Sequence, residues 1–303
     1  MTRKTRHDML TAMAFISPWL LGLIVFTLYP LSASLYLSFN DYDVLSKPVF
    51  VGAENYTDMA GDTIFWRSLY NTLIYAMFAI PLGLFLSLMV AVLLNQAARG
   101  QSIFRTLFFL PSIVPLIAVA MVWMWIFQAE GLLNAALQPL FTLIGKITGQ
   151  SLDGPAWLTE AAWTKPTLIL AGLWQIGGTV VIFLAALQDV PRSLYESADL
   201  DGAGPAHKLW HITVPIISPV IYFNLVMGII SALQVFVTPF VLMPDGGAER
   251  SALFYAVYLY NNAFQYSQMG YACALAWVLF VLIASLTWVA TMMSRRHIYY
   301  AGA

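Results

Sequence analysis

Six long runs of apolar residues, none of which contains Asp, Glu, Lys, Arg or His, constrain the fold of this chain most strongly. A helix needs about 20 such residues to cross a bilayer, and each run has that length. Only 10% of all residues are charged, against about 25% in soluble proteins, and they lie in the connections and at the ends. The sequence therefore predicts an all-α integral membrane protein, a single domain over 1–303 with six transmembrane helices. The runs cover residues of about 12–39, 71–95, 106–128, 167–188, 214–243 and 270–293.

The basic start of the chain, MTRKTRHDML, leads directly into the first run, as it would in a signal peptide. The run from Thr11 to Phe39 is too long for the apolar part of a signal peptide, and it lacks a small-residue cleavage site at its end. We therefore expect a retained first helix that is bent at Pro18 or Pro30.

The distribution of Lys and Arg predicts the orientation, because these residues accumulate on the cytoplasmic side of membrane proteins. With a cytoplasmic N-terminus and six alternating helices, nine basic residues fall inside and five outside, whereas ten acidic residues fall outside and five inside. The sequence thus predicts a multi-pass protein of the cytoplasmic (inner) membrane with both termini in the cytoplasm. The polar segment between the fourth and fifth runs is then also cytoplasmic.

Nothing in the sequence favours an enzyme. The four histidines (7, 207, 211 and 297) have no metal-ligand spacing, and the chain has neither a nucleophile–base arrangement nor a glycine-rich phosphate loop with its lysine. We expect no catalytic residue, no metal, no cofactor in this chain and no nucleic-acid partner. Ion-coupled transporters usually carry ionisable groups at membrane depth, and these runs have none. Energy for active transport must therefore enter through another polypeptide.

The segment ESADLDGAGPAHKLWHITVP, residues 196–215, is the longest specific polar feature between two apolar runs. Ser193 and Glu196 have the spacing of a capping box, which predicts a helix start at Ser193. Gly202 permits a turn, and Pro205 suits the first position of a second short helix. The pattern predicts two short helices on the membrane surface. They either serve a specific function or only connect two membrane helices.

The same segment resembles the EAA loop of permeases from binding-protein-dependent ABC importers, whose pattern is E-[AS]-A-x3-G-A followed by I-x-[LV]-P. Ser197 stands where Ala is usual and Val214 where Leu is usual. The stretches PWLLGLIVFTLYPLSASLYLSF, NTLIYAMFAIPLGL and FRTLFFLPSIVPLIAVAMVWMWIF extend the resemblance over nearly the whole chain. It is closest to the sugar-transporting branch, to the maltose-type and glycerol-phosphate-type first permeases, and it implies the type I importer transmembrane fold.

The resemblance implies that residues 193–215 form a coupling loop that docks on a cytoplasmic ATPase. ATP and Mg would be bound by two copies of that ATPase, and a second homologous permease and a periplasmic or lipid-anchored solute-binding protein would complete the importer. The implied function is import of an oligosaccharide or related polyol by alternating access. A stand-alone channel or facilitator is the alternative, but it leaves the EAA pattern unexplained. The implied coupling residues are Glu196, Ser197, Ala198, Asp201, Gly202, Ala203, Ile212 and Pro215.

A solute path needs neutral polar side chains inside the spans, because a sugar requires hydrogen-bond partners that need not ionise. Gln234 and Thr238 are expected on one face of the fifth helix, where the maltose-type relative contacts sugar. Hydrogen bonding between helices is the alternative role for such residues, and packing is the alternative for the aromatic Phe236. The candidates are Gln175, Thr179, Asn224, Gln234, Phe236 and Thr238.

The segments 40–70 and 129–166, with MPDGGAERS after the fifth run, are expected on the outer side, where the resemblance places the binding protein. Segment 129–166 contains a helical apolar pattern at Leu133, Leu137, Leu140 and Ile144. This stripe favours a helix lying on the outer leaflet over a partner groove. Trp157 and Trp163 fit either an aromatic belt or a partner contact.

Overall fold

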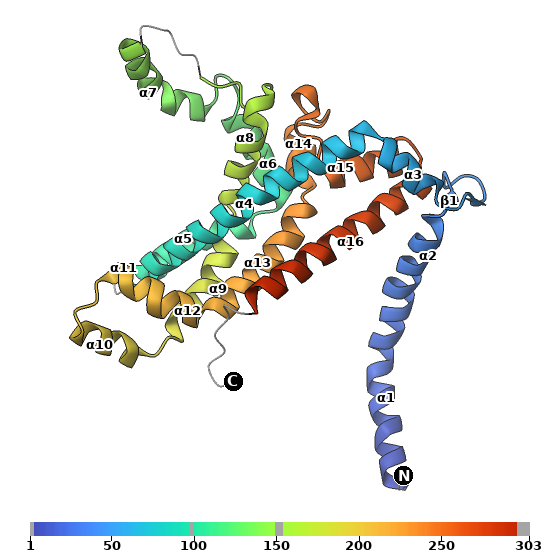
Figure 1. Ribbon diagram of the computed structural model, residues 1–303, viewed down its shortest axis with the longest axis horizontal. Helices are drawn as coiled ribbons and strands as arrows, with labels where there is room; N and C mark the ends of the chain where they lie inside the picture. Colours follow the sequence, from blue (N-terminus) through green and yellow to red (C-terminus); the bar gives the residue numbers. More distant parts are fainter. Residues whose placement is uncertain (1–2, 97–99, 149–153, 296–303) are drawn as a thin grey trace. The chain divides into compact units, whose positions relative to one another are not determined.

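The computed structural model describes residues 3–96, 100–148 and 154–295, and these are mainly helical, as predicted (Figure 1). Within these described ranges, four helices are long and apolar enough to cross a membrane, and two bent helix pairs raise the number to six if each pair is one span. The chain divides into two compact units, residues 3–62 with 259–280, and residues 63–258 with 281–295. Each unit is described by itself.

The first unit begins with a long helix that contains a π-helical turn directly before Pro30. Proline has no backbone N–H, and the ring of Pro30 would clash with the carbonyl four residues earlier in a regular α-helix. The hydrogen-bond pattern therefore changes there. The elements are α1 (Arg3–Leu23), η1 (Ile24–Leu28), α2 (Tyr29–Leu37), β1 (Asn40–Asp41), β2 (Val49–Phe50), α3 (Glu54–Gly61), η4 (Asn261–Gln265) and the first part of α16 (Met269–Ser294).

Strands β1 and β2 form a small antiparallel hairpin in which Asn40 pairs with Phe50. The start of α16 approaches this hairpin so closely that a Cβ on Gly270 would lie 2.0 Å from the carbonyl oxygen of Asn40. The Gly270 N–H donates to the carbonyl of Tyr42 at 3.0 Å. Only glycine fits at this contact.

The second unit contains the remaining helices. They are α4 (Thr63–Asn95), α5 (Gln101–Ile113), α6 (Leu116–Ile126), α7 (Leu132–Thr148), α8 (Ala161–Leu173), α9 (Gly177–Gln188), α10 (Arg192–Leu200), α11 (Pro205–Lys208), η2 (Leu209–Thr213), α12 (Val214–Ile216), α13 (Ser218–Leu233), α14 (Val237–Leu242), η3 (Ala248–Arg250), the first part of α15 (Tyr255–Tyr260) and the end of α16.

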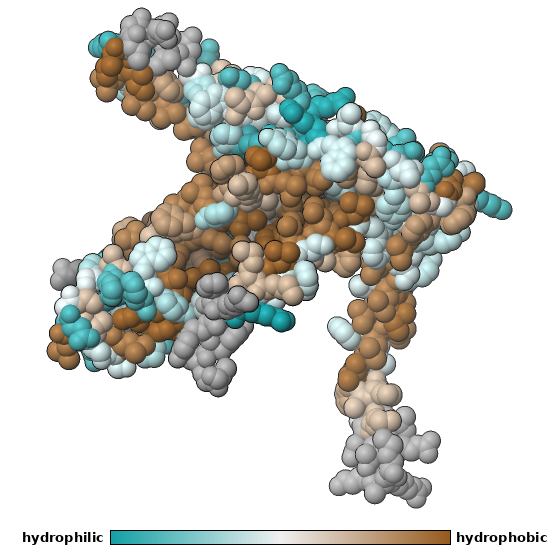
Figure 2. Space-filling model, in the orientation of Figure 1, coloured by the Kyte–Doolittle hydropathy of each residue, from teal (hydrophilic) through white to brown (hydrophobic). Residues whose placement is uncertain are grey.

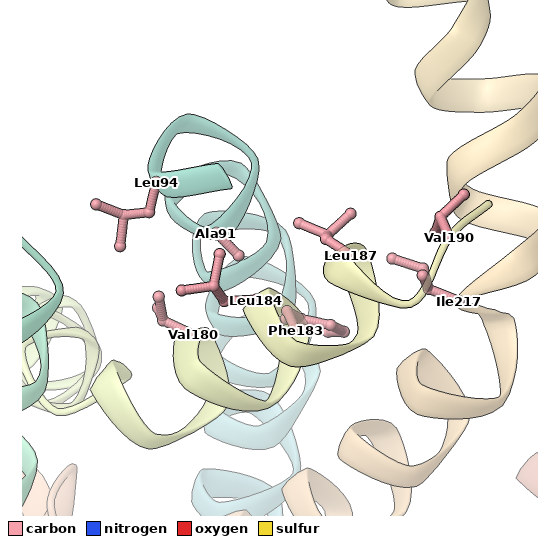
Figure 3. Packing of buried hydrophobic residues seen from close by; sticks show 8 residues of the cluster. All are labelled: Ala91, Leu94, Val180, Phe183, Leu184, Leu187, Val190 and Ile217. Atoms are coloured by element: carbon pink, nitrogen blue, oxygen red, sulfur yellow. The ribbon is translucent and has the colours of Figure 1, made fainter. Parts of the chain in front are cut away.

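The packed centre of the second unit lies between α4 and α9 (Figure 3). Ala91 of α4 is completely buried, and its small side chain lets the bulky side chains of α9, such as Phe183 and Leu187, approach the α4 backbone. Val190 and Ile217 extend the cluster from the ends of the neighbouring elements. This cluster fixes the helix ends from which α10–α12 project.

Three of the apolar runs are interrupted rather than straight. Helices α5 and α6 bend by 98° at Val114 and Pro115, and α8 and α9 bend by 51° before Gly177. The fifth run is interrupted between α13 and α14, because Pro239 lacks an N–H and its ring would clash with the carbonyl of Val235 in a continuous helix. These interruptions determine the shape of the cavity described below.

Candidate functional site

The spacing of Ala198, Gly202 and Ala203 is explained by the turn that ends α10. The Ala203 N–H donates to the Ala198 carbonyl at 2.9 Å, and the Gly202 N–H donates to the Asp199 carbonyl at 3.1 Å. Gly202 has φ of +75°. This is a Schellman motif with glycine at its left-handed position. A residue with a Cβ at this position would lower the stability of the fold by about 1–2 kcal/mol. A Cβ on Gly202 would meet no described atom within 4 Å, so the requirement is conformational rather than steric.

The predicted capping box is wrong. Helix α10 begins at Arg192 with Pro191 as its N-cap, and no side-chain hydrogen bond from the described residues caps it. Pro191 has the extended ψ of 125° that an N-cap needs, so the helix starts one residue before Ser193 becomes available for this role. The second short helix does begin at Pro205, as predicted, with Gly204 as its N-cap.

Two side-chain contacts connect α10 to the returning chain. The Lys208 ammonium pairs with the Asp199 carboxylate across the turn. The Tyr195 hydroxyl lies 2.7 Å from the hydroxyl of Thr213, which is only 4% exposed. Thr213 ends the π-helical turn η2, a type of irregularity that is common at functional sites. The two short helices are therefore held together as one structured element.

The same element is anchored to the packed centre of the unit. Tyr195, Ile212 and Ile216 pack against the α4–α9 cluster, which accounts for the apolar residue of the pattern at Ile212. Pro215 is the second residue of α12, separated by one residue from the end of η2. A displacement of α10 would thus be transmitted to the ends of α4, α9 and α13 through side-chain packing.

The outward surface of α10 combines carboxylates with an exposed leucine. Glu196, Ser197 and Asp201 are exposed, whereas Ala198 and Ala203 are half-buried. Leu200 is 91% exposed between Asp199 and Asp201, and the surface at α10 in Figure 2 mixes hydrophilic and hydrophobic side chains. Single exposed leucines are common on protein surfaces, so Leu200 alone does not identify a contact.

A cavity of about 480 Å³ lies among α4, α8, α9, α13 and α14. All six side chains predicted for a solute path line it, although they come from separate elements. None of the described residues that line it carries a charge. The six are Gln175, Thr179, Asn224, Gln234, Phe236 and Thr238.

The helix interruptions meet at this cavity. Gln175 lies in the break between α8 and α9, and its side-chain amide donates at 3.4 Å to the carbonyl of Val114, which lies in the break between α5 and α6. Gln234 ends α13. The expectation that Gln234 and Thr238 share one helix face is wrong, because Pro239 interrupts the helix between them, yet both line the cavity. Irregular backbone at membrane depth is tolerated where it lines a cavity.

The individual lining residues differ in how free their polar groups are. The Asn224 side-chain amide donates to the carbonyl of Val220 on its own helix at 2.9 Å, so part of its hydrogen-bonding capacity is used locally. Phe236 stacks on Phe240 with ring centroids 5.0 Å apart. The buried hydroxyl of Ser87 has no hydrogen-bond partner among the described residues. Sequence reasoning missed Ser87, a single serine in the second half of the run at 71–95.

Among the residues that the structure describes, no three His, Cys, Asp or Glu side chains gather into a metal site. Broken helices around a cavity without charged lining residues, with a structured polar element at the helix ends, fit a membrane permease. A model of the family described as binding-protein-dependent transport system inner membrane component matches residues 63–299, and the chain belongs to this family. It is thus a multi-pass permease subunit of an ABC transporter, with the type I importer transmembrane fold.

Relatives support this assignment over the full length. The probable ABC transporter permease protein YesP of Bacillus subtilis is 41% identical over 302 residues, covering 99% of this chain and 95% of YesP. The sulfoquinovosyl glycerol transport system permease protein SmoG of Agrobacterium fabrum is 32% identical, covering 92% of this chain and 89% of SmoG. A chain of a bacterial alginate ABC transporter, solved with an alginate pentasaccharide-bound periplasmic protein, has the same fold with a TM-score of 0.81, at 24% identity and over 97% and 96% of the two chains.

Proposed function

We propose that this permease subunit serves an importer of a carbohydrate, an oligosaccharide or a related polyol, and that the 480 Å³ cavity is its part of the solute path. The cavity is the observation that carries the proposal, because its lining offers neutral donors and acceptors beside an aromatic ring. Sugars are bound by such groups. Relatives named for sulfoquinovosyl glycerol, lactose and diacetylchitobiose transport support a carbohydrate as the solute.

The element formed by α10 and α11 is proposed to dock on a cytoplasmic ATPase. Glu196, Ser197 and Asp201 would provide polar contacts, and Leu200 would enter an apolar pocket of the partner. The Schellman turn at Gly202 would hold the two short helices at a fixed angle. The remaining residues of the pattern, Ala198, Ala203, Ile212 and Pro215, would shape and anchor the element.

The complete importer would contain this chain, a second homologous permease, two ATPase subunits that hold ATP and Mg, and a periplasmic or lipid-anchored binding protein. In the proposed orientation both termini and the 193–215 loop are cytoplasmic, which agrees with the positive-inside distribution. Closure of the ATPase dimer would move the α10–α11 elements together and switch the cavity between its two openings by rigid-body motion.

The test is purification of the transporter from its host membrane, followed by uptake into proteoliposomes that contain ATP. Recovery of an ATPase and a second permease, with uptake that requires ATP, is expected. Charge reversal by Glu196→Lys is expected to abolish uptake, whereas the same change at the exposed Asp189, which lies outside the 193–215 loop, should leave uptake unchanged. Recovery of the chain alone, with uptake that needs no ATP, would instead identify a facilitator.

The solute path is tested separately with the same vesicles. Gln234→Ala and Phe236→Ala are expected to lower solute uptake while the binding-protein-stimulated ATPase activity persists. Phe240→Leu is the matched control, because Phe240 stacks on Phe236 but does not line the cavity. Full uptake in both cavity variants would remove the cavity from the solute path and leave the coupling role untouched.

A further inference from the structure

Helix α7 is attached rigidly where the bent spans α6 and α8 end. The buried side chain of Asn134 uses both of its polar ends there: its amide donates to the carbonyls of Ala129 at 2.9 Å and Pro155 at 3.2 Å, and its oxygen accepts from the Trp157 indole N–H at 2.7 Å. A Cβ on Gly154 would lie 2.5 Å from the Asn134 side chain. The position of the first turn of α7 is thus fixed by the chain on both sides of it.

The predicted apolar stripe of α7 is divided between two faces. Leu133 and Leu137 pack against the buried cluster of Phe127, Trp157 and Ala171. Trp157 is therefore part of this internal cluster and only 8% exposed, which excludes it from an aromatic belt. This inner face is fully used by the unit itself.

A second apolar face of α7 has no partner among the described residues of the second unit. It consists of Leu132, Leu140, Leu143 and Ile147, which are 55%, 49%, 56% and 77% exposed. At 3.6 residues per turn these four side chains lie within about 80° of the helix circumference. The polar residues Gln138, Thr142 and Lys146 follow one another at four-residue spacing and form a separate strip. Figure 2 shows a largely hydrophobic surface on α7.

We propose that α7 lies in the lipid–water interface, with this second face among the acyl chains and Lys146 at the level of the anionic headgroups. The chemistry of the face favours lipid over a protein partner, because all four side chains are aliphatic, whereas protein hot spots are rich in Trp, Tyr and Arg. Helix α7 contains no acidic residue, and Lys146 is its one charge, located in the last turn. A lysine at that place reaches the phosphates while its stem stays in the apolar layer.

The surface of helix α6 also favours lipid as the partner of this face of α7. Helix α6 carries exposed apolar side chains up to its last turn, including Met121 at 62% and Trp125 at 60% exposure. The exposed apolar face of α7 thus continues a surface that a membrane span presents to lipid. Trp125 has the position expected of an interfacial tryptophan at the end of a span. The interface therefore lies at the level where α7 leaves α6.

The test uses the assembled transporter in vesicles of phosphatidylethanolamine and phosphatidylglycerol, with Cys273→Ala removing the single native thiol. A fluorophore is attached to one introduced cysteine at a time, at Leu143 or Ile147 on the apolar face and at Gln138 or Thr142 on the polar strip. Each is then quenched by doxyl-labelled lipid or by aqueous iodide. The four sites lie within three helical turns of one another along α7, so each polar site is the control for its apolar neighbour.

Labels at Leu143 and Ile147 are expected to be quenched several-fold more by doxyl lipid than by iodide, with the reverse at Gln138 and Thr142. Equal iodide access on both faces would overturn the proposal. Iodide access that disappears only when the solute-binding protein is added would overturn it in favour of a protein-docking face. The outcome does not depend on the nature of the solute or on whether α10 binds an ATPase.

Discussion

The glycine pair at the start of α9 provides a sharp test of the packing around the cavity. A Cβ on Gly177 would lie 2.3 Å from the carbonyl oxygen of Phe108 and 3.0 Å from the Cα of Phe109, both on α5. The clash is with backbone, which a side-chain rotation cannot relieve. A Cβ on Gly178 would meet no described atom within 4 Å. The two adjacent residues therefore form a matched pair for the same substitution.

Gly177→Ala is expected to destabilise the protein by about 1–3 kcal/mol, the usual cost of overpacking. Gly178→Ala is expected to be neutral or to stabilise by up to about 1 kcal/mol, because alanine loses less backbone entropy in a helix than glycine does. Thermal unfolding of the detergent-solubilised chain, followed by size exclusion of a fluorescent fusion, measures the difference. At roughly 2–4 °C for each kcal/mol in a chain of this size, the two variants should differ by several degrees.

The same pair should differ in uptake. Gly177 follows the break that contains Gln175, and Gln175 bonds to the Val114 carbonyl across the cavity wall. Separation of α5 from α9 would lengthen this bond, so Gly177→Ala is expected to lower uptake at equal membrane levels while Gly178→Ala retains it. Equal unfolding temperatures for the two variants would refute the claim that α5 and α9 are in backbone contact at this residue.

Three further outcomes are expected. Uptake should decrease in the order Gly202, Gly202→Asn, Gly202→Ala, because asparagine tolerates the left-handed conformation better than alanine; initial uptake rates at equal membrane levels measure this order. Tyr195→Phe and Thr213→Val should each destabilise the protein by about 0.5–1.5 kcal/mol, and the double variant by less than the sum, since both remove the same hydrogen bond; a double-mutant cycle on the unfolding temperature tests it. Collapse of the proton gradient at constant ATP should leave uptake unchanged, because no span run contains an ionisable side chain, and loss of uptake under these conditions would indicate ion coupling.

The sequence predicted the helical membrane fold because hydropathy and charge segregation are averages over about 20 residues. It also predicted the turn at Gly202 and the helix start at Pro205, because both depend on single residues with restricted or permissive backbones. The cap at Ser193 was wrong because its neighbour Pro191 already provides the extended backbone that an N-cap needs.

The cavity was predicted as a set of residues but not as a shape. Averaged hydropathy does not detect a break inside an apolar run, so Gln234 and Thr238 were placed on one helical face. Pro239 and Pro115 were the available signals, since a helix cannot continue regularly through the residues that precede them. The sequence predicted a helix on the outer leaflet from the apolar stripe of segment 129–166. Periodicity could not show that Leu133 and Leu137 of this stripe pack against the protein itself.

The uncharged spans have a consequence for the energetics of the cell. Moving one elementary charge through the membrane potential is worth about 2.3 kcal/mol per 100 mV, and voltage-gated proteins depend on this work. None of the six apolar runs contains a charged side chain that a conformational change could carry through the field. The equilibrium between the two openings of this permease should therefore have no gating charge and no voltage dependence of its own. A depolarised cell with sufficient ATP would retain the full conformational cycle.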